Sequence, residues 1–209
     1  MKILPRDRFQ LCCCLLLAVV FVASCLNPPY LQFLLMQHVP TVLAGLLLLW
    51  LANRLVISRH SFFCMTLFLC LHTLGARYLY SYTPYDNWTE QIFGVTITEI
   101  FDFQRNHYDR LVHFSYGLLL VIPVQEFERR YLKLSFFWSS VLAVEFILAT
   151  SAAYELLEWI VAVTFTPEWA DQFLGQQGDQ FDAMKDMALA TSGAVLSMLV
   201  MAVVQRRKE

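Results

Sequence analysis

The stretch NHYDRLVHFSYGLLLVIPV, residues 106–124, places charged and titratable side chains directly in front of an apolar run. His107, Asp109, Arg110 and His113 fall within its first eight residues, and the residues that follow are almost all apolar. Apolar runs of this kind are typical of helices that cross a lipid bilayer. A charged side chain at the bilayer centre costs about 2.5–3.5 kcal/mol even on a mild scale. The charged mouth of this helix therefore needs partners.

The composition of the whole chain is that of a membrane protein. Its 209 residues are 58% hydrophobic and 15% charged, whereas a soluble domain is about 45–50% apolar and about 25% charged. The mean hydropathy is +0.52. The net charge of −2 and the lack of a basic run or zinc-finger spacing exclude a nucleic-acid partner and leave membrane lipids as the surroundings.

Six runs are long and apolar enough to cross a membrane, which takes about 17–25 residues. They predict an all-α, polytopic membrane helix bundle that forms one integral-membrane domain over residues 1–209. The predicted spans are 9–26, 39–57, 62–80, 108–124, 135–163 and 184–204. The loop at 81–107 is rich in tyrosine and too polar to span, so we expect a short helix in the membrane interface there.

Basic residues predict the orientation, because cytoplasmic loops of membrane proteins are enriched in lysine and arginine. With both termini in the cytoplasm, eleven of the fifteen basic residues fall inside. The four on the outer side are Arg77, Arg105, Arg110 and Lys185, and each stands near acidic or histidine residues. We therefore expect both termini to be cytoplasmic and these four cations to belong to an outer site.

Helical spacing groups the polar side chains of the fourth and fifth predicted spans. Asp109 and His113 are four residues apart, and Glu155 and Glu158 are three apart, so each pair shares one helix face. At 1.5 Å per residue, the two glutamates lie about 30–35 Å along a helix that runs outward. That distance places them near the outer boundary, level with Asp109.

The sixth predicted span has a similar acidic mouth. Asp179, Asp182 and Asp186 follow an i, i+3, i+7 pattern, with Lys185 beside them. Capping of the helix is a simpler explanation for Asp179 and Asp182, but Asp186 lies a turn deeper. A boundary ion pair is likewise the simpler explanation for Asp109 beside Arg110. We expect the charged ends of the fourth, fifth and sixth predicted spans to meet in one cavity that opens outward.

Histidine combined with several carboxylates suits a divalent metal of the zinc, manganese or iron type, or acid–base chemistry. The candidate catalytic residues are His113, Asp109, Glu155, Glu158, Asp182 and Asp186. The candidate metal ligands are His113, Glu155, Glu158, Asp182 and Asp186. The candidate substrate-binding residues are Arg110, Lys185, His107 and Asp179.

The segments NHYDRLVHF, YELLEW and GDQFDAMKDM together resemble the YjdF family of bacterial inner-membrane proteins, over essentially the whole chain. That resemblance implies a multi-pass protein of the inner membrane and no particular activity. A looser resemblance to VanZ-like proteins rests on Asp109-Arg110-x-x-His113, on Glu155-x-x-Glu158 and on the aspartates that follow. The chain departs from the VanZ pattern at Glu158, where that family has glutamine, and at Ala190, where it has asparagine.

Three functions fit these residues. The first is an outward-facing site that binds or transforms a lipid-linked or envelope glycan or phosphate headgroup, with or without a divalent metal. The second is a small proton- or ion-coupled transporter that uses the same residues together with Glu145. The third is a membrane assembly protein whose charges only hold helices together. The sequence leaves the substrate, the metal and the oligomeric state open.

Overall fold

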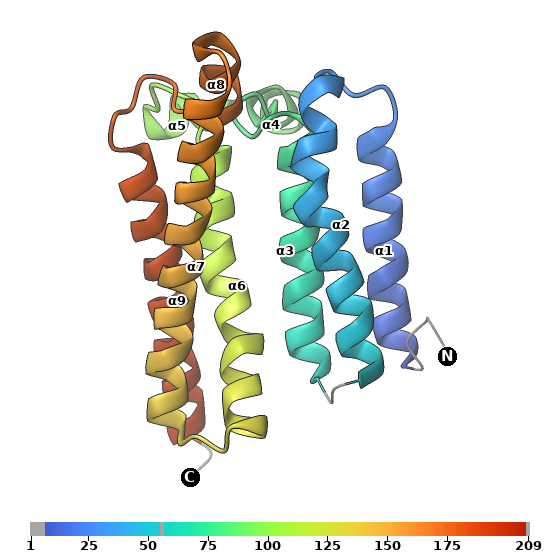
Figure 1. The fold of residues 1–209 in the computed structure, drawn as a ribbon, viewed down its shortest axis with the longest axis vertical. Coiled ribbons are helices and arrows are strands. Elements are labelled where there is room, and N and C mark those ends of the chain that lie inside the picture. The colour runs from blue at the N-terminus through green and yellow to red at the C-terminus, as the bar shows by residue number, and fades with distance from the viewer. Residues whose placement is uncertain (1–6, 55–56, 208–209) are drawn as a thin grey trace.

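A computed structural model describes residues 7–54 and 57–207, and every regular element in them is a helix (Figure 1). Six are long: α1 (Arg8–Cys25), α2 (Leu31–Arg54), α3 (Arg59–Arg77), α6 (Tyr108–Tyr131), α7 (Phe136–Thr164) and α9 (Asp182–Arg206). Three are short: α4 (Tyr85–Phe93), α5 (Ile97–Phe101) and α8 (Pro167–Leu174).

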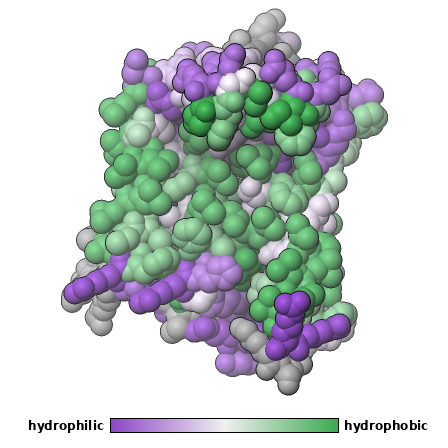
Figure 2. Space-filling model, turned by 180° about the vertical axis from the view of Figure 1, so that it is seen from behind, coloured by the Kyte–Doolittle hydropathy of each residue, from purple (hydrophilic) through white to green (hydrophobic). Residues whose placement is uncertain are grey.

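The long helices correspond to the six predicted spans, and four of them, α1, α2, α7 and α9, are long and apolar enough to cross a membrane. Helix α6 does not meet this measure, since its first turn is acidic and its last turn is basic. Helix α3 is also less apolar than the other four. On the face that Figure 2 shows, apolar residues form a belt with hydrophilic residues gathered at both ends, as a bilayer requires.

Two helix boundaries differ from the prediction by more than three residues. Helix α2 begins at Leu31 rather than at residue 39, and it continues through Pro40. Proline removes one backbone donor, and in this turn the Thr41 hydroxyl donates to the Gln37 carbonyl. Helix α6 runs on to Tyr131, seven residues past the predicted end at 124, because its charged last turns remain helical beyond the apolar run.

The long helices form two groups of three, α1–α2–α3 and α6–α7–α9, which meet where α3 packs against α6 (Figure 1). Helices α4, α5 and α8 lie over one end of the bundle, which we name the loop end. Helix α1 begins and α9 finishes at the opposite end, which we name the terminal end. The predicted loop at 81–107 therefore contains two helices, and α8 is a further short helix that the sequence pattern did not indicate.

Helices α6 and α9 make the closest contact in the bundle, and two glycines permit it. A Cβ atom added at Gly117 would overlap the Ala190 carbonyl, and one added at Gly193 would overlap the Phe114 carbonyl. Ala190 is itself fully buried. Small residues at a helix crossing let the two backbones approach closely. This contact places the acidic first turn of α9 directly against the first turn of α6.

The basic residues divide between the two ends of the bundle. The terminal end carries the last turns of α2, α6 and α9 and the first turns of α1 and α3, with Arg8, Arg54, Arg59, Arg129, Arg130 and Arg206. Lys2, Arg6 and Lys208, which also entered the orientation argument, lie outside the described residues. Arg77, Arg105, Arg110 and Lys185 belong to the loop end.

Candidate functional site

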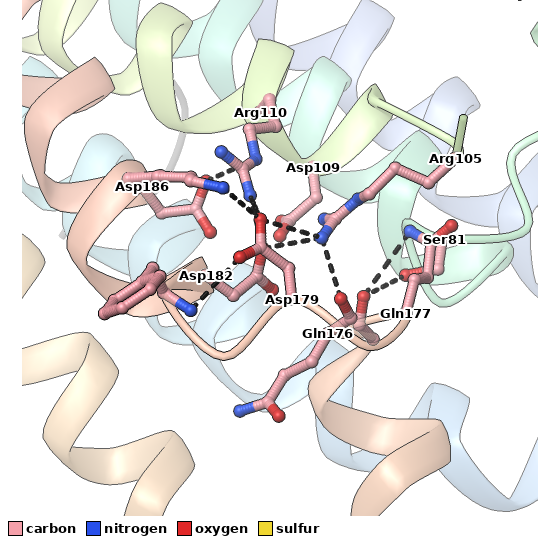
Figure 3. A network of polar contacts seen from close by, with 12 residues as sticks. Ser81, Arg105, Asp109, Arg110, Gln176, Gln177, Asp179, Asp182 and Asp186 are labelled. Carbon is pink, nitrogen blue, oxygen red and sulfur yellow. Dashed lines mark hydrogen bonds and ion pairs between the residues drawn. The ribbon is translucent and has the colours of Figure 1, made fainter. Parts of the chain in front are cut away.

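Arg110, in the first turn of α6, joins the three aspartates of α9 and the segment before it (Figure 3). Its Nη2 atom lies 2.6 Å from Asp182 Oδ1 and 2.9 Å from Asp179 Oδ2. Its Nε atom lies 3.6 Å from Asp186 Oδ1. Arg105 adds a second guanidinium, with Nη1 2.9 Å from Asp182 Oδ1. The planar fork of arginine suits such multiple carboxylate contacts.

Asp179 is held from several sides at the rim. Lys185 Nζ lies 2.6 Å from its Oδ2 atom, and the Phe181 backbone N–H donates to its Oδ1 atom at 3.1 Å. These hydrogen bonds, first that from Lys185 and then that from Phe181, lower the pKa of Asp179 from its ordinary 3.8 to about 2. Phe181 is the N-cap residue of α9 and provides no side-chain cap. Asp179 therefore joins a network of cations and does not only cap the helix.

A second cluster lies deeper, between α6, α7 and α9. His113 Nε2 is 3.6 Å from Asp109 Oδ1 and 3.8 Å from Glu155 Oε1. One ligand atom each from Asp109, His113 and Asp186 lies within 4.8 Å of the others. We name Asp109, His113, Glu155 and Asp186 the inner cluster. The donor atoms of Asp109, His113 and Asp186 are close enough to hold a metal ion, and Glu155 lies beside His113.

The inner cluster contains buried polar atoms without a hydrogen-bond partner among the described residues. They are Asp186 Oδ1 and Glu155 Oε1, together with Arg110 Nε and Arg105 Nη2 in the network above. A buried polar atom without a partner costs about 1–3 kcal/mol, and buried polar groups in native proteins are rarely left so. Unpaired atoms at this density are typical of a binding site rather than of structural ion pairs.

An apolar cavity of about 190 Å³ adjoins the inner cluster. Apolar side chains such as Ala44, Phe68 and Val112 form much of its wall, while Asp109 and His113 also line it. The wall is contributed by α2, α3, α6 and α7 and by the turn after α3, so the cavity lies between the two helix groups. An apolar chamber with polar groups at one place in its wall suits an amphiphile.

Several residues contribute to the loop end although sequence reasoning gave them no role there. Arg105 was predicted to belong to the outer site without a stated role, and it shares Asp182 with Arg110. Tyr80 follows α3 and hydrogen-bonds the imidazole of His72, and burial raises the pKa of its hydroxyl well above 10.0. Both side chains line the cavity. The turn that places Tyr80 has a left-handed backbone at Leu79 and Tyr80, which no apolar pattern signals.

Other predicted site residues lie apart from the inner cluster. The His107 ring stacks on Phe103 with centroids 4.0 Å apart, and burial and the nearby Arg105 and Arg110 lower its pKa. Glu158 lies about one turn beyond Glu155 on α7 and interacts with Tyr154. No ion pair joins Glu158 to the network within residues 7–54 and 57–207.

Two expectations were wrong. Arg77 does not join the outer site: its Nη1 atom donates to the carbonyls of Ala23, Ser24 and Leu26 at 3.1, 2.8 and 2.9 Å. It therefore caps the end of α1, whose last carbonyls lack helical partners. Glu145, proposed for a transport path, is exposed on α7 and is not among the residues that line the cavity.

The comparisons with known proteins agree with a membrane protein. Residues 9–207 match the family described as "Predicted membrane protein (DUF2238)". The chain is 32% identical over 173 residues to "Inner membrane protein YjdF" of Escherichia coli (strain K12), covering 80% of this chain and 77% of that protein. The resemblance to the YjdF family is thereby confirmed, and the VanZ-like resemblance stays a prediction. No solved structure matches the chain.

Proposed function

The chain belongs to the DUF2238 family of predicted membrane proteins, and from that premise we propose that it binds or transforms the headgroup of an envelope amphiphile. The headgroup, a phosphate or a sugar, would meet the inner cluster while its hydrocarbon chain occupies the apolar cavity. The protein would act in the bacterial inner membrane, as the name of its E. coli relative suggests. Its partners are then membrane lipids and a lipid-linked or envelope headgroup.

One observation carries this proposal: Asp109 and His113, two members of the inner cluster, line a largely apolar cavity between the two helix groups. Within that site, His113 is the candidate base, since Asp109 and Glu155 flank its Nε2 atom at 3.6 and 3.8 Å. Asp186 completes the inner cluster. Glu158 and Asp182 are the further candidate carboxylates near it. His107 and Asp179 would form the rim through which a headgroup passes.

The site would face the periplasm in a chain of six spans with both termini in the cytoplasm. The two ends of the bundle support this orientation, because seven described arginines, Arg207 included, and Lys133 gather at the terminal end and basic residues favour the cytoplasm. Reporter fusions test it: a fusion at Asp86 should report the periplasm and a fusion at Glu128 the cytoplasm. The opposite result would turn the site toward the cytoplasm and end the proposal of a periplasmic substrate.

Binding of two matched probes tests the proposed function itself. A fluorescent single-chain amphiphile with a phosphate headgroup should bind the purified protein at least about tenfold tighter than an uncharged monoacylglycerol of the same chain, a difference of about 1.4 kcal/mol. Lys185→Ala should abolish this preference, because it removes a cation at the headgroup end. Ala44→Trp should weaken both probes alike, because it fills the cavity. Equal binding of both probes to every variant would contradict the proposal.

A second candidate function, transport, is favoured by a second cavity. It has a volume of about 450 Å³ and lies nearer the terminal end of the same helices, with Glu126 and Glu128 in its wall. Tyr116 lines both cavities, so the two cavities adjoin the same side chain. Transport predicts proton or cation flux in reconstituted vesicles that rises in Tyr116→Ala. Vesicles with no flux in either protein would remove this alternative.

A further inference from the structure

We infer that the inner cluster holds a divalent transition-metal ion, bound by Asp109 and His113 of α6, Asp186 of α9 and Glu155 of α7. The inference rests on the proposed function for its purpose, since the ion would receive the anionic headgroup. Its physical basis is independent and comes from charge, from unpaired donor atoms and from geometry.

Charge is the first argument. The network and the inner cluster bring six carboxylates to the loop end: Asp109, Glu155, Glu158, Asp179, Asp182 and Asp186. Only three permanent cations, Arg105, Arg110 and Lys185, accompany them. Ionised carboxylates in a low-dielectric site require compensation, so the excess of three carboxylates is met either by protons or by a cation. A divalent ion meets two of these three charges, and the imidazole that binds it stays neutral.

The distribution of the cations is the second argument. Arg105, Arg110 and Lys185 make their short contacts, of 2.6 to 2.9 Å, with Asp179 and Asp182. The contact that reaches the inner cluster is the 3.6 Å approach of Arg110 Nε to Asp186 Oδ1, and neither atom forms a hydrogen bond there. The negative charge without compensation is therefore concentrated on Asp109, Asp186 and Glu155.

Unpaired atoms are the third argument. Asp186 is only 2% exposed, and its Oδ1 atom has no hydrogen-bond partner among the described residues. The Glu155 side chain is 9% exposed, and its Oε1 atom is also unpaired there. Both carboxylates approach His113 or its cluster partners without the geometry of a hydrogen bond. Oxygen atoms held close together and away from donors are the arrangement that a cation satisfies.

The geometry restricts the ligands more narrowly than the sequence did. One donor atom each of Asp109, His113 and Asp186 lies within 4.8 Å of the others, a span that one ion with ligand distances of about 2.0–2.2 Å can nearly bridge. Asp182, a predicted ligand, is instead saturated by two guanidinium groups. Glu158, another predicted ligand, lies about a turn farther along α7. Asp109, which was not among the predicted ligands, takes the place of Asp182 and Glu158 in the set of ligands.

The donor set indicates the class of metal. Imidazole nitrogen suits zinc and iron, and carboxylate oxygen suits manganese and magnesium, so one imidazole with three carboxylates favours Mn²⁺, Fe²⁺ or Zn²⁺ over Ca²⁺. Such an ion would offset two of the three uncompensated negative charges and would offer an open coordination position to a phosphate headgroup. Without it, the inner cluster repels an anion, because the arginines and Lys185 are committed to Asp179 and Asp182.

Elemental analysis of the full-length protein, purified in mild detergent, tests the inference with the metal alone. We expect about one transition-metal ion per chain, or restored binding of added Mn²⁺ after treatment with a chelator, detected by its electron paramagnetic resonance. His113→Ala and Asp186→Asn should each weaken Mn²⁺ binding by at least about 10–100-fold, the loss typical even of outer-shell ligand changes. The matched controls His60→Ala and Glu126→Gln, which alter an imidazole and a carboxylate at the terminal end, should bind Mn²⁺ as the unaltered protein does.

Two results would overturn the inference. The first is a protein that carries no metal and binds Mn²⁺, Fe²⁺ and Zn²⁺ with dissociation constants above about 1 mM. The second is metal binding that survives both His113→Ala and Asp186→Asn. If His113→Ala does not fold, as judged by its melting temperature and elution volume, Asp109→Asn replaces it. A metal-free protein that still prefers the phosphate amphiphile would refute the metal site and leave the proposed function standing, whereas metal binding without that preference would do the reverse.

Discussion

Helix α6 carries a polar cluster at each end, and the two clusters differ in how completely their charges are satisfied. At the terminal end, Glu126 accepts hydrogen bonds from the Ser58 N–H and hydroxyl at 2.9 and 2.6 Å and one from the Ser61 hydroxyl, and Arg130 lies 3.1 Å away. At the loop end, buried oxygens of Asp186 and Glu155 have no such donors among the described residues. The carboxylate of Glu126 is fully paired without a ligand, although Glu128 Oε2 nearby is not, whereas two carboxylates at the loop end have unpaired oxygens.

The difference indicates a structural role for one cluster and a binding role for the other. Ser58 is the N-cap residue of α3, so Glu126 links the start of α3 to the end of α6. Its negative charge also interacts favourably with the positive N-terminal end of α3. The loop end has the same kinds of residues but more carboxylates than donors. Satisfied polar clusters stabilise a fold, whereas unsatisfied ones are kept where a ligand completes them.

The largest effect should come from removing the cation that supports the loop end. Arg110→Met leaves Asp179, Asp182 and Asp186 with less compensation in a mostly buried network. Loss of one partner from a buried ion pair costs about 3–5 kcal/mol, and we expect a destabilisation of that size in reversible unfolding from detergent. Arg110→Lys keeps the charge but not the planar fork, so it should lose less. A loss below about 1 kcal/mol for Arg110→Met would assign these contacts to the weak class of surface pairs.

A smaller loss is expected at the terminal end. Glu126→Gln keeps one acceptor oxygen but removes the charge that Ser58, Ser61 and Arg130 share. Loss of charge-assisted hydrogen bonds costs about 1.5–3 kcal/mol, measured by the same unfolding assay. Metal content and amphiphile binding should stay unchanged. If Glu126→Gln also abolished binding at the loop end, the two clusters would not be separate in function.

Neutralising a carboxylate at the loop end should instead increase the stability of the protein. In protein treated with a chelator, Asp186→Asn removes one uncompensated negative charge, so we expect stabilisation by about 0.5–2 kcal/mol, the usual size when a functional site is relieved of strain. Comparison of the melting temperatures of Asp186→Asn and Glu126→Gln checks this contrast directly. Destabilisation of both variants to a similar extent would mean that Asp186 is a structural residue like Glu126.

The smallest effect should be on the pH dependence of folding stability, through Asp179 at the rim. Because the pKa of Asp179 falls from 3.8 to about 2 in the folded protein, its ionised form stabilises folding. That contribution is complete above pH 3.8 and is lost as the pH falls toward 2. Melting temperatures measured between pH 5 and pH 2.5 should therefore decline less steeply in Asp179→Asn than in the unaltered protein. Identical slopes would show that Lys185 and Arg110 do not hold Asp179 in solution.

Much of the bundle could be predicted from local patterns. The six apolar runs correspond to the six long helices, and Asp109 with His113, four residues apart, do share a face of α6 because helical spacing is fixed. Helix boundaries were less predictable where proline or charge interrupts a run, as at Pro40 and after Val124. The roles of Arg77 and Glu145 were misassigned, because nothing local shows that Arg77 reaches the end of α1 or that Glu145 faces outward.

The sequence by itself determined the class of the protein, its helices and the helix faces that carry charge. These follow from hydropathy and from the 3.6-residue period of the helix, which act within one segment. The tertiary structure alone decided which carboxylates are neutralised. Asp182 receives two guanidinium groups, while Asp186, one turn later on α9, has an unpaired oxygen. The physical reason is that charge compensation depends on distances of a few ångströms between side chains of different helices, and the close packing of α6 on α9 through Gly117 and Gly193 sets those distances.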